Sequence, residues 1–357
     1  MQADGERAQG AREEKTDLRF AWRNGTRKQI CGLHGGTERK NGFAVCMEER
    51  NVNTELEQVV IQVGKVVKGK DDVIRKVLAA VLAGGHVLLE DIPGVGKTTL
   101  AMALGKAMEL DYRRMQFTPD VLPSDIVGFT MYNGASGTFE YKQGAIFSNL
   151  FLADELNRTS SKTQSALLEV MEEGKVTVDG ITHALPEPFT VIATENPYGS
   201  SGTQLLPESQ LDRFLICLTM GYPDHKAAVD ILKESAGKGL ELVQPVLTGE
   251  RLLELRQQTR ELHVSDNLYE YVVNLTEETR KDPRIALGVS PRGSIALLKM
   301  ARAMAMIRGG EYVIPEDVLS VIPETWAHRI HLNAMARAEG TSVPGIIREI
   351  TKRIRAV

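Results

Sequence analysis

The sequence predicts an α/β fold built on a parallel sheet with a phosphate-binding loop, followed by a smaller all-helical domain. A short apolar strand passes through a Gly/Pro-rich loop into a helix at residues 86–99, with the sequence HVLLEDIPGVGKTT. Further apolar strands end in polar residues, and strand patterns nearly stop after Tyr222–Pro223. Strands that alternate with helical segments are typical of a parallel sheet, and the later run of helical periodicity indicates a second domain.

Composition narrows the classes of function. The chain has 357 residues, a net charge of −4 and 5% aromatic residues. An acidic chain has no general attraction to nucleic acid or to anionic membranes, and few aromatics argue against base-stacking surfaces. Three cysteines make no disulfide framework, so we expect a reducing cytoplasm. There is no apolar run of about 20 residues to span a bilayer and no apolar signal-peptide core.

The first 50 residues differ from the rest. They are rich in Gly, Arg, Glu and Asn and show no sustained hydrophobic periodicity. Such a segment buries too little apolar surface to offset its ordering entropy, so we expect residues 1–50 to be a disordered extension, with Met47 as a candidate natural start. Cys31, His34 and Cys46 have a spacing that fits no common zinc pattern.

Two helices are expected before the loop. Leu56, Val59, Val60 and Val63 recur at helical spacing, and a second amphipathic segment runs from Asp71 to the glycines at 84 and 85.

The loop itself resembles the phosphate-binding pattern GxxxxGK[ST], with Asp91 at the first glycine. Gly94 and Gly96 allow backbone N–H groups to turn toward phosphate oxygens, and the helix that follows directs its positive dipole end at the same anion. Lys97 supplies a charge for the β- and γ-phosphates, and Thr98 has a hydroxyl for Mg²⁺. An acid facing triphosphate is unfavourable, so Asp91 is expected to point away or to cap the turn. The residues expected to surround the phosphates are Asp91, Ile92, Pro93, Gly94, Val95, Gly96, Lys97, Thr98 and Thr99.

A Gly-rich turn that binds no phosphate remains the alternative for this loop, and the later segments decide between the two. A helix follows the loop, then a short buried strand at Met115–Phe117 and a hairpin within residues 122–144.

Residues 149–155 predict a central strand buried on both faces, which ends in Asp154 and Glu155. Ligands of open α/β sheets bind beyond the carboxyl ends of such strands. Asp154 would hold Mg²⁺, directly or through water, and Glu155 would polarise the attacking water. Helix capping is the alternative role for these two acids.

A helix and a second hairpin, with Asp179–Gly180 as its turn, precede the next buried strand at residues 189–194. That strand brings Asn196 to the same edge, where its amide can contact the γ-phosphate and the water; a plain turn residue is the alternative. A short helix then ends at Asp212–Arg213, and the strand of residues 214–220 closes the sheet. Arg213 either pairs locally with Asp212 or projects into the ATP of a neighbouring subunit.

The remaining segments predict helices. One of them carries Arg292 in its first turn, where a cation opposes the helix dipole, so an anionic partner such as a nucleotide phosphate is expected; packing or a surface ion pair is the alternative. The basic C-terminal segment is expected to pack as a last helix rather than to lie on a membrane.

With these segments in order, the chain resembles the MoxR family of AAA+ ATPases. The resemblance covers the chain from about residue 53 to the end of the helical domain. It rests on LLEDIPGVGKTTLA, MQFTPDVLPSDIVGF, FLADELNRTSSKTQSALLEVMEEGKVTVDG, IATENP, LPESQLDRF, GVSPRGSIALLKMARAMAMIRG and YVIPEDV.

The resemblance implies a AAA+ αβα ATPase domain over residues 51–222 and a helical lid over residues 223–357. It also implies ATP and Mg²⁺ as cofactors and roles for individual residues, which are Lys97 and Thr98 in Walker A, Asp154 and Glu155 in Walker B, Asn196 as sensor 1, Arg213 as arginine finger and Arg292 as sensor 2. The family tolerates an acid at Asp91.

The resemblance further implies a homo-oligomeric ring, usually a hexamer, with ATP at each subunit interface and a chaperone-like action on partner complexes. Partners of the family often carry a von Willebrand factor A domain. Three alternatives are a nucleic-acid-remodelling motor, a magnesium-chelatase-like subunit and a nucleotide switch that does not hydrolyse ATP. The acidic net charge opposes the first, and a full set of catalytic groups opposes the last.

Overall fold

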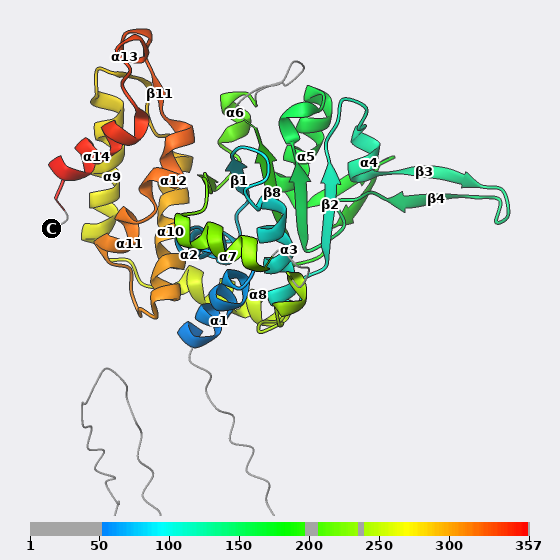
Figure 1. Ribbon diagram of the computed structural model, residues 1–357. Helices are drawn as coiled ribbons and strands as arrows, with labels where there is room; N and C mark the ends of the chain where they lie inside the picture. Colours follow the sequence, from blue (N-terminus) through cyan, green and yellow to red (C-terminus); the bar gives the residue numbers. More distant parts are fainter. Residues whose placement is uncertain (1–51, 197–205, 235–238, 356–357) are drawn as a thin grey trace, which may run out of the picture. The chain divides into compact units, whose positions relative to one another are not determined.

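The computed structural model describes residues 52–196, 206–234 and 239–355 (Figure 1). The predicted extension at residues 1–50, with Cys31, His34 and Cys46, lies outside them. The described residues contain a parallel sheet of five strands, whose spatial order is β2 (Tyr112–Gln116), β5 (Leu150–Asp154), β8 (Thr190–Glu195), β1 (Val87–Glu90) and β9 (Ile216–Leu218).

Helices cover both faces of this sheet, because the inner strands are apolar on both sides. Leu89 and Leu152 belong to one buried cluster, whereas Leu88 and Phe151 belong to another on the opposite face. This layering confirms the predicted αβα arrangement. The helices of this part are α1 (Val52–Gly64), α2 (Asp71–Leu82), α3 (Lys97–Ala107), α4 (Pro123–Val127), α5 (Ser161–Glu173) and α6 (Glu208–Leu211).

Two antiparallel hairpins interrupt the layers, as predicted. The first pairs β3 (Gly128–Asn133) with β4 (Thr138–Gln143) and extends away from the sheet (Figure 1). The second pairs β6 (Lys175–Val178) with β7 (Ile181–Ala184). The rings of Tyr141 and His183 stack with centroids 4.0 Å apart, so the two hairpins contact each other.

The strand expected to be buried at Met115–Phe117 was placed wrongly. β2 runs instead from Tyr112 to Gln116, and three of its side chains, those of Arg113, Arg114 and Gln116, are exposed. It is an edge strand with a neighbour on one side only, which lets charged residues occupy it. The apolar run MQF marks the end of this strand rather than its centre.

The C-terminal part is helical, with one short ribbon that the sequence pattern did not indicate. The ribbon pairs β10 (Ile285–Leu287) with β11 (His331–Leu332). Residues 315–330, whose sequence pattern predicts one helix, are divided, since a new helix begins at Ile322 with Pro323 in its first turn. The helices are α7 (His225–Glu234), α8 (Gly249–Glu261), α9 (Asp266–Lys281), α10 (Pro291–Arg308), α11 (Pro315–Leu319), α12 (Ile322–Trp326), α13 (Ala334–Ala338) and α14 (Val343–Arg353). Single turns of 3-10 helix occur at η1 (Leu156–Arg158), η2 (Leu240–Leu242) and η3 (Ala327–Arg329).

The last helix packs on the protein, as expected, because Ile346, Ile347 and Ile350 of α14 are buried. None of the described helices combines the length and the apolar character that a membrane crossing requires.

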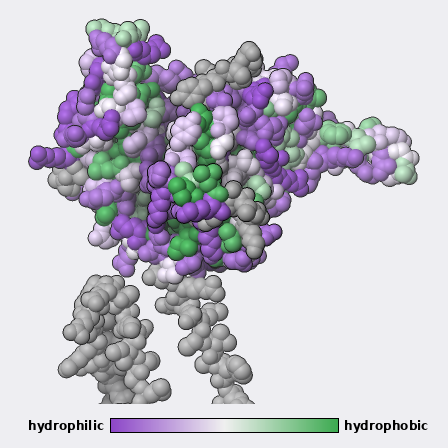
Figure 2. Space-filling view, in the orientation of Figure 1, coloured by the Kyte–Doolittle hydropathy of each residue, from purple (hydrophilic) through white to green (hydrophobic). Residues whose placement is uncertain are grey.

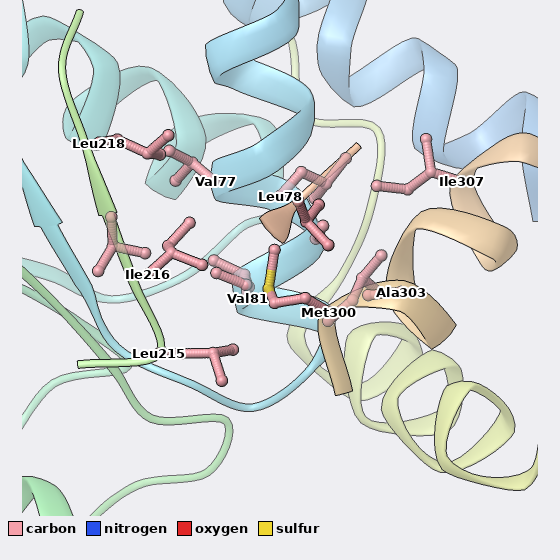
Figure 3. Packing of buried hydrophobic residues seen from close by; sticks show 14 of the residues in the cluster. Val77, Leu78, Val81, Leu215, Ile216, Leu218, Met300, Ala303 and Ile307 are labelled. Atoms are coloured by element: carbon pink, nitrogen blue, oxygen red, sulfur yellow. The ribbon is translucent and has the colours of Figure 1, made fainter. Parts of the chain in front are cut away.

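The sheet and the helical part share one hydrophobic cluster. Figure 3 shows Val81 of α2, Leu215 just before β9 and Ile216 of β9 together with Met300 and Ile307 of α10. The helices α1 and α2 both contact α10, so the N-terminal helices join the two parts. The boundary at residue 222 stays a prediction.

An acidic pair lies at the carboxyl end of two neighbouring strands. Glu90 of β1 and Glu195 of β8 are in register, and Glu195 is buried, with no hydrogen-bond partner for its Oε1 atom among the described residues. Burial, together with the charge of Glu90, raises the pKa of Glu195 to about 7.

We predict that the shared cluster dominates stability. Met300 is fully buried and Met335 is 71% exposed, and both lie in helices. Met300→Ala should lower the free energy of unfolding by about 2–5 kcal/mol because it leaves a cavity, whereas Met335→Ala should change it by less than about 0.5 kcal/mol. Urea unfolding followed by circular dichroism measures both. Equal effects would contradict the shared core.

We predict that Glu195 makes stability fall as pH rises. The carboxyl keeps its proton to about pH 7 when folded, against an ordinary pKa of 4.5, so the folded chain binds more protons between these values. The contribution of Glu195 is therefore complete below about pH 4.5 and is lost as pH rises through 7. Glu195→Gln should raise the free energy of unfolding at pH 8 by about 1–3 kcal/mol and change it little at pH 4.

Denaturant unfolding at several pH values measures this, with the exposed Glu250→Gln as the control. A pH slope that is the same in Glu195→Gln and in the natural protein would show that folding does not raise the pKa of Glu195.

Candidate nucleotide-binding site

The loop between β1 and α3 has the conformation that a phosphate-binding loop needs. Gly94 and Gly96 have φ angles of 84° and 94°, in the left-handed region that favours glycine. No heavy atom lies within 4 Å of a Cβ placed on Gly94, so this glycine is required by backbone conformation and not by crowding. α3 begins at Lys97, with Thr98 and Thr99 in its first turn. The free N–H groups of this turn form an anion site.

Lys97 lies against the loop and near the two acids of β5. Its Nζ donates to the backbone oxygens of Asp91 at 2.6 Å and Glu195 at 3.4 Å. Burial lowers the pKa of Lys97, and the charges of Asp91, Asp154 and Glu155 oppose this shift. The amine is thus close enough to these carboxylates for their charges to affect its pKa. Its hydrogen-bond partners among the described residues are the two carbonyl oxygens, which phosphate oxygens can replace.

The Asp91 side chain caps the turn, as the sequence suggested. One carboxylate oxygen accepts from the backbone N–H of Ile92 at 2.8 Å, and the other accepts from that of Gly221 at 2.5 Å. Its backbone N–H donates to the oxygen of Glu195. The carboxylate therefore joins the loop to the segment that leaves β9, and it is satisfied by two donors.

Asp154 ends β5 and is held by two side chains that sequence reasoning missed. Thr194 donates its hydroxyl to Oδ1 at 2.7 Å, and Arg114 donates to Oδ2 from Nη2 at 2.7 Å and from Nε at 3.1 Å. The Thr194 hydroxyl also accepts from the backbone N–H of Glu155 at 2.9 Å. The register of β2 and β8 with β5 brings both side chains to Asp154, and one sequence without strand order does not show that register.

Glu155 has an unusual backbone. Its φ of 58° and ψ of 48° lie in the left-handed region, which costs about 1–3 kcal/mol for a residue other than glycine. The carboxylate is 28% exposed and pairs with Arg158 at 2.7 Å. Such strain persists where the surrounding structure enforces it, and here the hydrogen bond that the Glu155 N–H donates to the Thr194 hydroxyl helps to hold this backbone. The helix-capping alternative for Glu155 fails, because its side chain caps neither η1 nor α5.

Asn196 follows β8 directly and lies at the same edge of the sheet. Its backbone oxygen accepts from the Nδ2 atom of Asn157 at 3.0 Å. β1, β5 and β8 are parallel neighbours, so the loop, Asp154, Glu155 and Asn196 all follow strands at one edge. The structure thus brings these predicted residues together.

Arg213 and Arg292 lie at the opposite edge. Arg213 precedes β9, whereas the loop follows the parallel strand β1, and even a four-residue strand spans roughly 13 Å. Both arginines line a cavity of about 210 Å³ together with Gly85 and His86, which precede β1. No loop residue lines this cavity. The structure therefore does not bring these two residues to the loop of their own chain.

The local partner of Arg213 is not Asp212. Arg213 Nε lies 3.4 Å from Glu172, whereas the Asp212 carboxylate accepts from Arg329 Nε at 2.6 Å. The local ion pair considered from the sequence is thus wrong. Arg292 Nη1 lies 3.2 Å from the same Glu172 carboxylate, so a surface ion pair is present at this position.

The residues of the loop edge fit a nucleotide with magnesium. Among the described residues, no three His, Cys, Asp or Glu side chains form a cluster that could hold a metal alone. Mg²⁺ needs no such cluster when one or two protein oxygens share it with phosphates and water. Thr98 and Asp154 could supply those oxygens, and Lys97 with the loop could hold the phosphates.

Comparisons with known proteins identify the families to which the two parts of the chain are similar. The family described as "ATPase family associated with various cellular activities (AAA)" matches residues 86–216, and the AAA lid domain family matches residues 277–350.

Relatives extend over most of the chain. The chain is 46% identical to YeaC of Bacillus subtilis over 86% of this chain and 96% of that protein. It is 37% identical to chaperone MoxR1 of Mycobacterium tuberculosis over 84% of this chain and 81% of that protein. A crystal structure of a Cytophaga hutchinsonii protein matches with a TM-score of 0.80 and 39% identity, over 86% of this chain and 96% of that one. The chain belongs to the MoxR family of AAA+ ATPases.

Proposed function

We propose that this protein hydrolyses the β–γ phosphate bond of ATP at an interface between two copies of the chain and uses the energy to remodel a partner protein. The separation of the polar groups between the two edges of one sheet carries the proposal. Lys97, Asp154, Glu155 and Asn196 follow strands at one edge, whereas Arg213 and Arg292 lie at the other. A complete set of groups requires the arginines of a second copy.

The proposed reaction uses each side chain in one role. The loop N–H groups and Lys97 hold the β- and γ-phosphates, and Asn196 orients a water molecule against the γ-phosphorus. Glu155 accepts the proton of that water as its oxygen bonds to phosphorus and the bond to the ADP oxygen breaks, which yields ADP and phosphate. Thr98 and Asp154 would hold Mg²⁺, which neutralises charge on the phosphates.

The arginines of the adjacent copy complete the site. Arg213 is the proposed arginine finger and Arg292 the proposed sensor 2, and both would spread the negative charge of the transferring phosphoryl group. In such a contact between copies, the side of the sheet where strands begin in one copy faces the side where strands end in the next copy, so the contact is heterologous. Heterologous contacts close into a ring when the rotation between neighbouring copies divides a full circle evenly. A hexamer is the size that the family favours.

Exposed apolar side chains on the first hairpin favour a protein partner. Phe129, Tyr132 and Phe139 are 46%, 58% and 75% exposed, and Figure 2 shows apolar residues along this projecting segment. A two-stranded hairpin buries little of its own apolar surface, which makes it suited to contact another protein. A partner with a von Willebrand factor A domain is the expectation from the family, and action in the cytoplasm is the expectation from the few cysteines. A role as a magnesium-chelatase-like subunit has no specific support in the structure.

A nucleic-acid motor is the second candidate, since related AAA+ proteins act on DNA. The hairpins offer few cations, mainly Lys142 and Lys175, and the chain is acidic overall. Stimulation of ATP hydrolysis by DNA that weakens steeply with added salt would favour this candidate over a protein partner.

We predict that Glu155→Gln binds ATP but loses turnover. The amide keeps the size of the side chain but accepts no proton, so kcat should fall by about 10²–10⁴-fold. Steady-state hydrolysis and fluorescent-ATP binding measure the two properties, with Glu250→Gln as the control. Unchanged turnover in Glu155→Gln would overturn the proposed hydrolysis at this site.

We predict that two inactive variants complement each other. Lys97→Ala removes the phosphate contact and Arg213→Ala removes the finger, so each should be inactive alone. In a randomly mixed assembly, about a quarter of the interfaces combine an intact loop with an intact Arg213. Hydrolysis should therefore recover on mixing, measured as phosphate release. If no mixing ratio restores turnover, although size-exclusion chromatography shows mixed assemblies, Arg213 does not act on a neighbour.

A further inference from the structure

One carboxylate contacts both of the arginines assigned to the neighbouring copy. Glu172 lies in the last turn of α5, with Oε1 3.2 Å from Arg292 Nη1 and Oε2 3.4 Å from Arg213 Nε. The two arginines come from segments far apart in sequence, and each oxygen of Glu172 serves one of them.

The backbones that carry these arginines are fixed by a single segment of the helical part. Arg329 of η3 donates to the Asp212 carboxylate at 2.6 Å and to the Phe214 oxygen at 2.6 Å, which holds the residues on both sides of Arg213. Trp326, three residues earlier, donates its Nε1 to the Gly293 oxygen at 3.0 Å, next to Arg292. The backbone positions of Arg213 and Arg292 are thus fixed, and only the direction of their long side chains remains to be determined.

Among the charged residues around the two arginines, Glu172 is the carboxylate that is able to align their side chains. The charged residues that line the cavity are Glu172, Asp212, Arg213, Arg292, Lys299 and Arg329. The cationic side chains in this cavity outnumber the acidic ones, and one of the two acids, Asp212, already forms an ion pair with Arg329. Without Glu172, two guanidinium groups that repel each other would face no free acid, and their side chains would separate.

We propose that Glu172 is a positioning residue for ATP hydrolysis, which holds Arg213 and Arg292 side by side so that both meet the triphosphate of the adjacent copy. This inference rests on the proposed function. It adds a residue whose own carboxylate touches no nucleotide and acts through the arginines.

The contacts of Glu172 suit positioning better than stabilisation. Its side chain is 42% exposed, and those of Arg213 and Arg292 are 31% and 46% exposed. Ion pairs with this exposure contribute about 0–1 kcal/mol to stability. Both distances exceed the roughly 2.7–2.9 Å of a strong charged hydrogen bond, so a triphosphate can draw the guanidinium groups away.

The test compares Glu172→Gln with the control Glu173→Gln. Among the described residues, the Glu173 carboxylate forms an ion pair only with Lys175, at 3.4 Å. Glu172→Gln should lower kcat by roughly 10–100-fold, less than full removal of a finger, and change KM by less than about 3-fold, because the loop that binds ATP is intact. Glu173→Gln should keep the natural kcat. Glu172→Asp, which restores the charge on a shorter side chain, should recover part of the loss.

The role of the arginines is tested in the same assay. In an Arg213→Ala/Arg292→Ala background, Glu172→Gln should cause no further loss, because the residues through which it acts are absent. Mixing Glu172→Gln subunits with Lys97→Ala subunits should restore hydrolysis, since the defect lies at the site of the neighbouring copy. Thermal unfolding should show the same Tm for all single variants within about 2 °C.

The outcomes separate this inference from the proposed function. If Arg213→Ala keeps natural turnover, the proposed action on a neighbour fails. If Arg213→Ala loses turnover while Glu172→Gln keeps it, only the role of Glu172 fails. A further loss from Glu172→Gln in the background that lacks both arginines also overturns it, because the carboxylate would then act by another route.

Discussion

The parallel direction of the five strands is the constraint on which the remaining features depend. In a parallel sheet all strands begin at one side of the sheet, the first edge, and end at the opposite side, the second edge. Asp154 ends a strand, and the phosphate loop, Glu155 and Asn196 each follow one, so all four lie at the second edge. Arg213 precedes a strand and is left at the first. In an antiparallel sheet, strand beginnings and strand ends would lie at the same edge, so the phosphate-binding residues and Arg213 could be neighbours. The parallel sheet separates them within one chain, and a second copy of the chain can bring them together.

A buried arginine joins the helical part to the first edge. Desolvation lowers the pKa of Arg329, and the Asp212 carboxylate opposes that shift. Its guanidinium also donates to the backbone oxygens of Thr325, Phe214 and Leu215. A charge removed from water needs this number of acceptors, and loss of its ionic partner would cost about 3–5 kcal/mol. Arg329 therefore makes the position of the loop before β9 depend on how the helical part is packed.

The second edge is organised by a hydroxyl. Thr194 donates to Asp154 and accepts from the backbone of Glu155, so one side chain sets the position of both acids. Arg114 adds a cation to Asp154 from the edge strand. A carboxylate has about four lone-pair sites, so Asp154 can still ligate a metal through one of them while its three hydrogen bonds from Thr194 and Arg114 remain.

The sequence by itself determined the order of the elements, the phosphate-binding loop and the family. The glycines, Lys97 and the acids after a buried strand are local signals that need no knowledge of distant contacts. The strand at Met115–Phe117 was misplaced because burial on one side or both depends on strand order, and the division near Pro323 was missed because a helical pattern continued across it.

Tertiary structure alone decided which charges meet. The sequence left open whether Arg213 pairs with Asp212, and packing instead pairs Asp212 with Arg329 and Arg213 with Glu172. Thr194 and Arg114 were invisible as supports of Asp154, since their roles arise from strand register. Ion pairs and cross-strand bonds join residues distant in sequence, so local periodicity carries no information about them, whereas a loop or a buried strand is a property of consecutive residues.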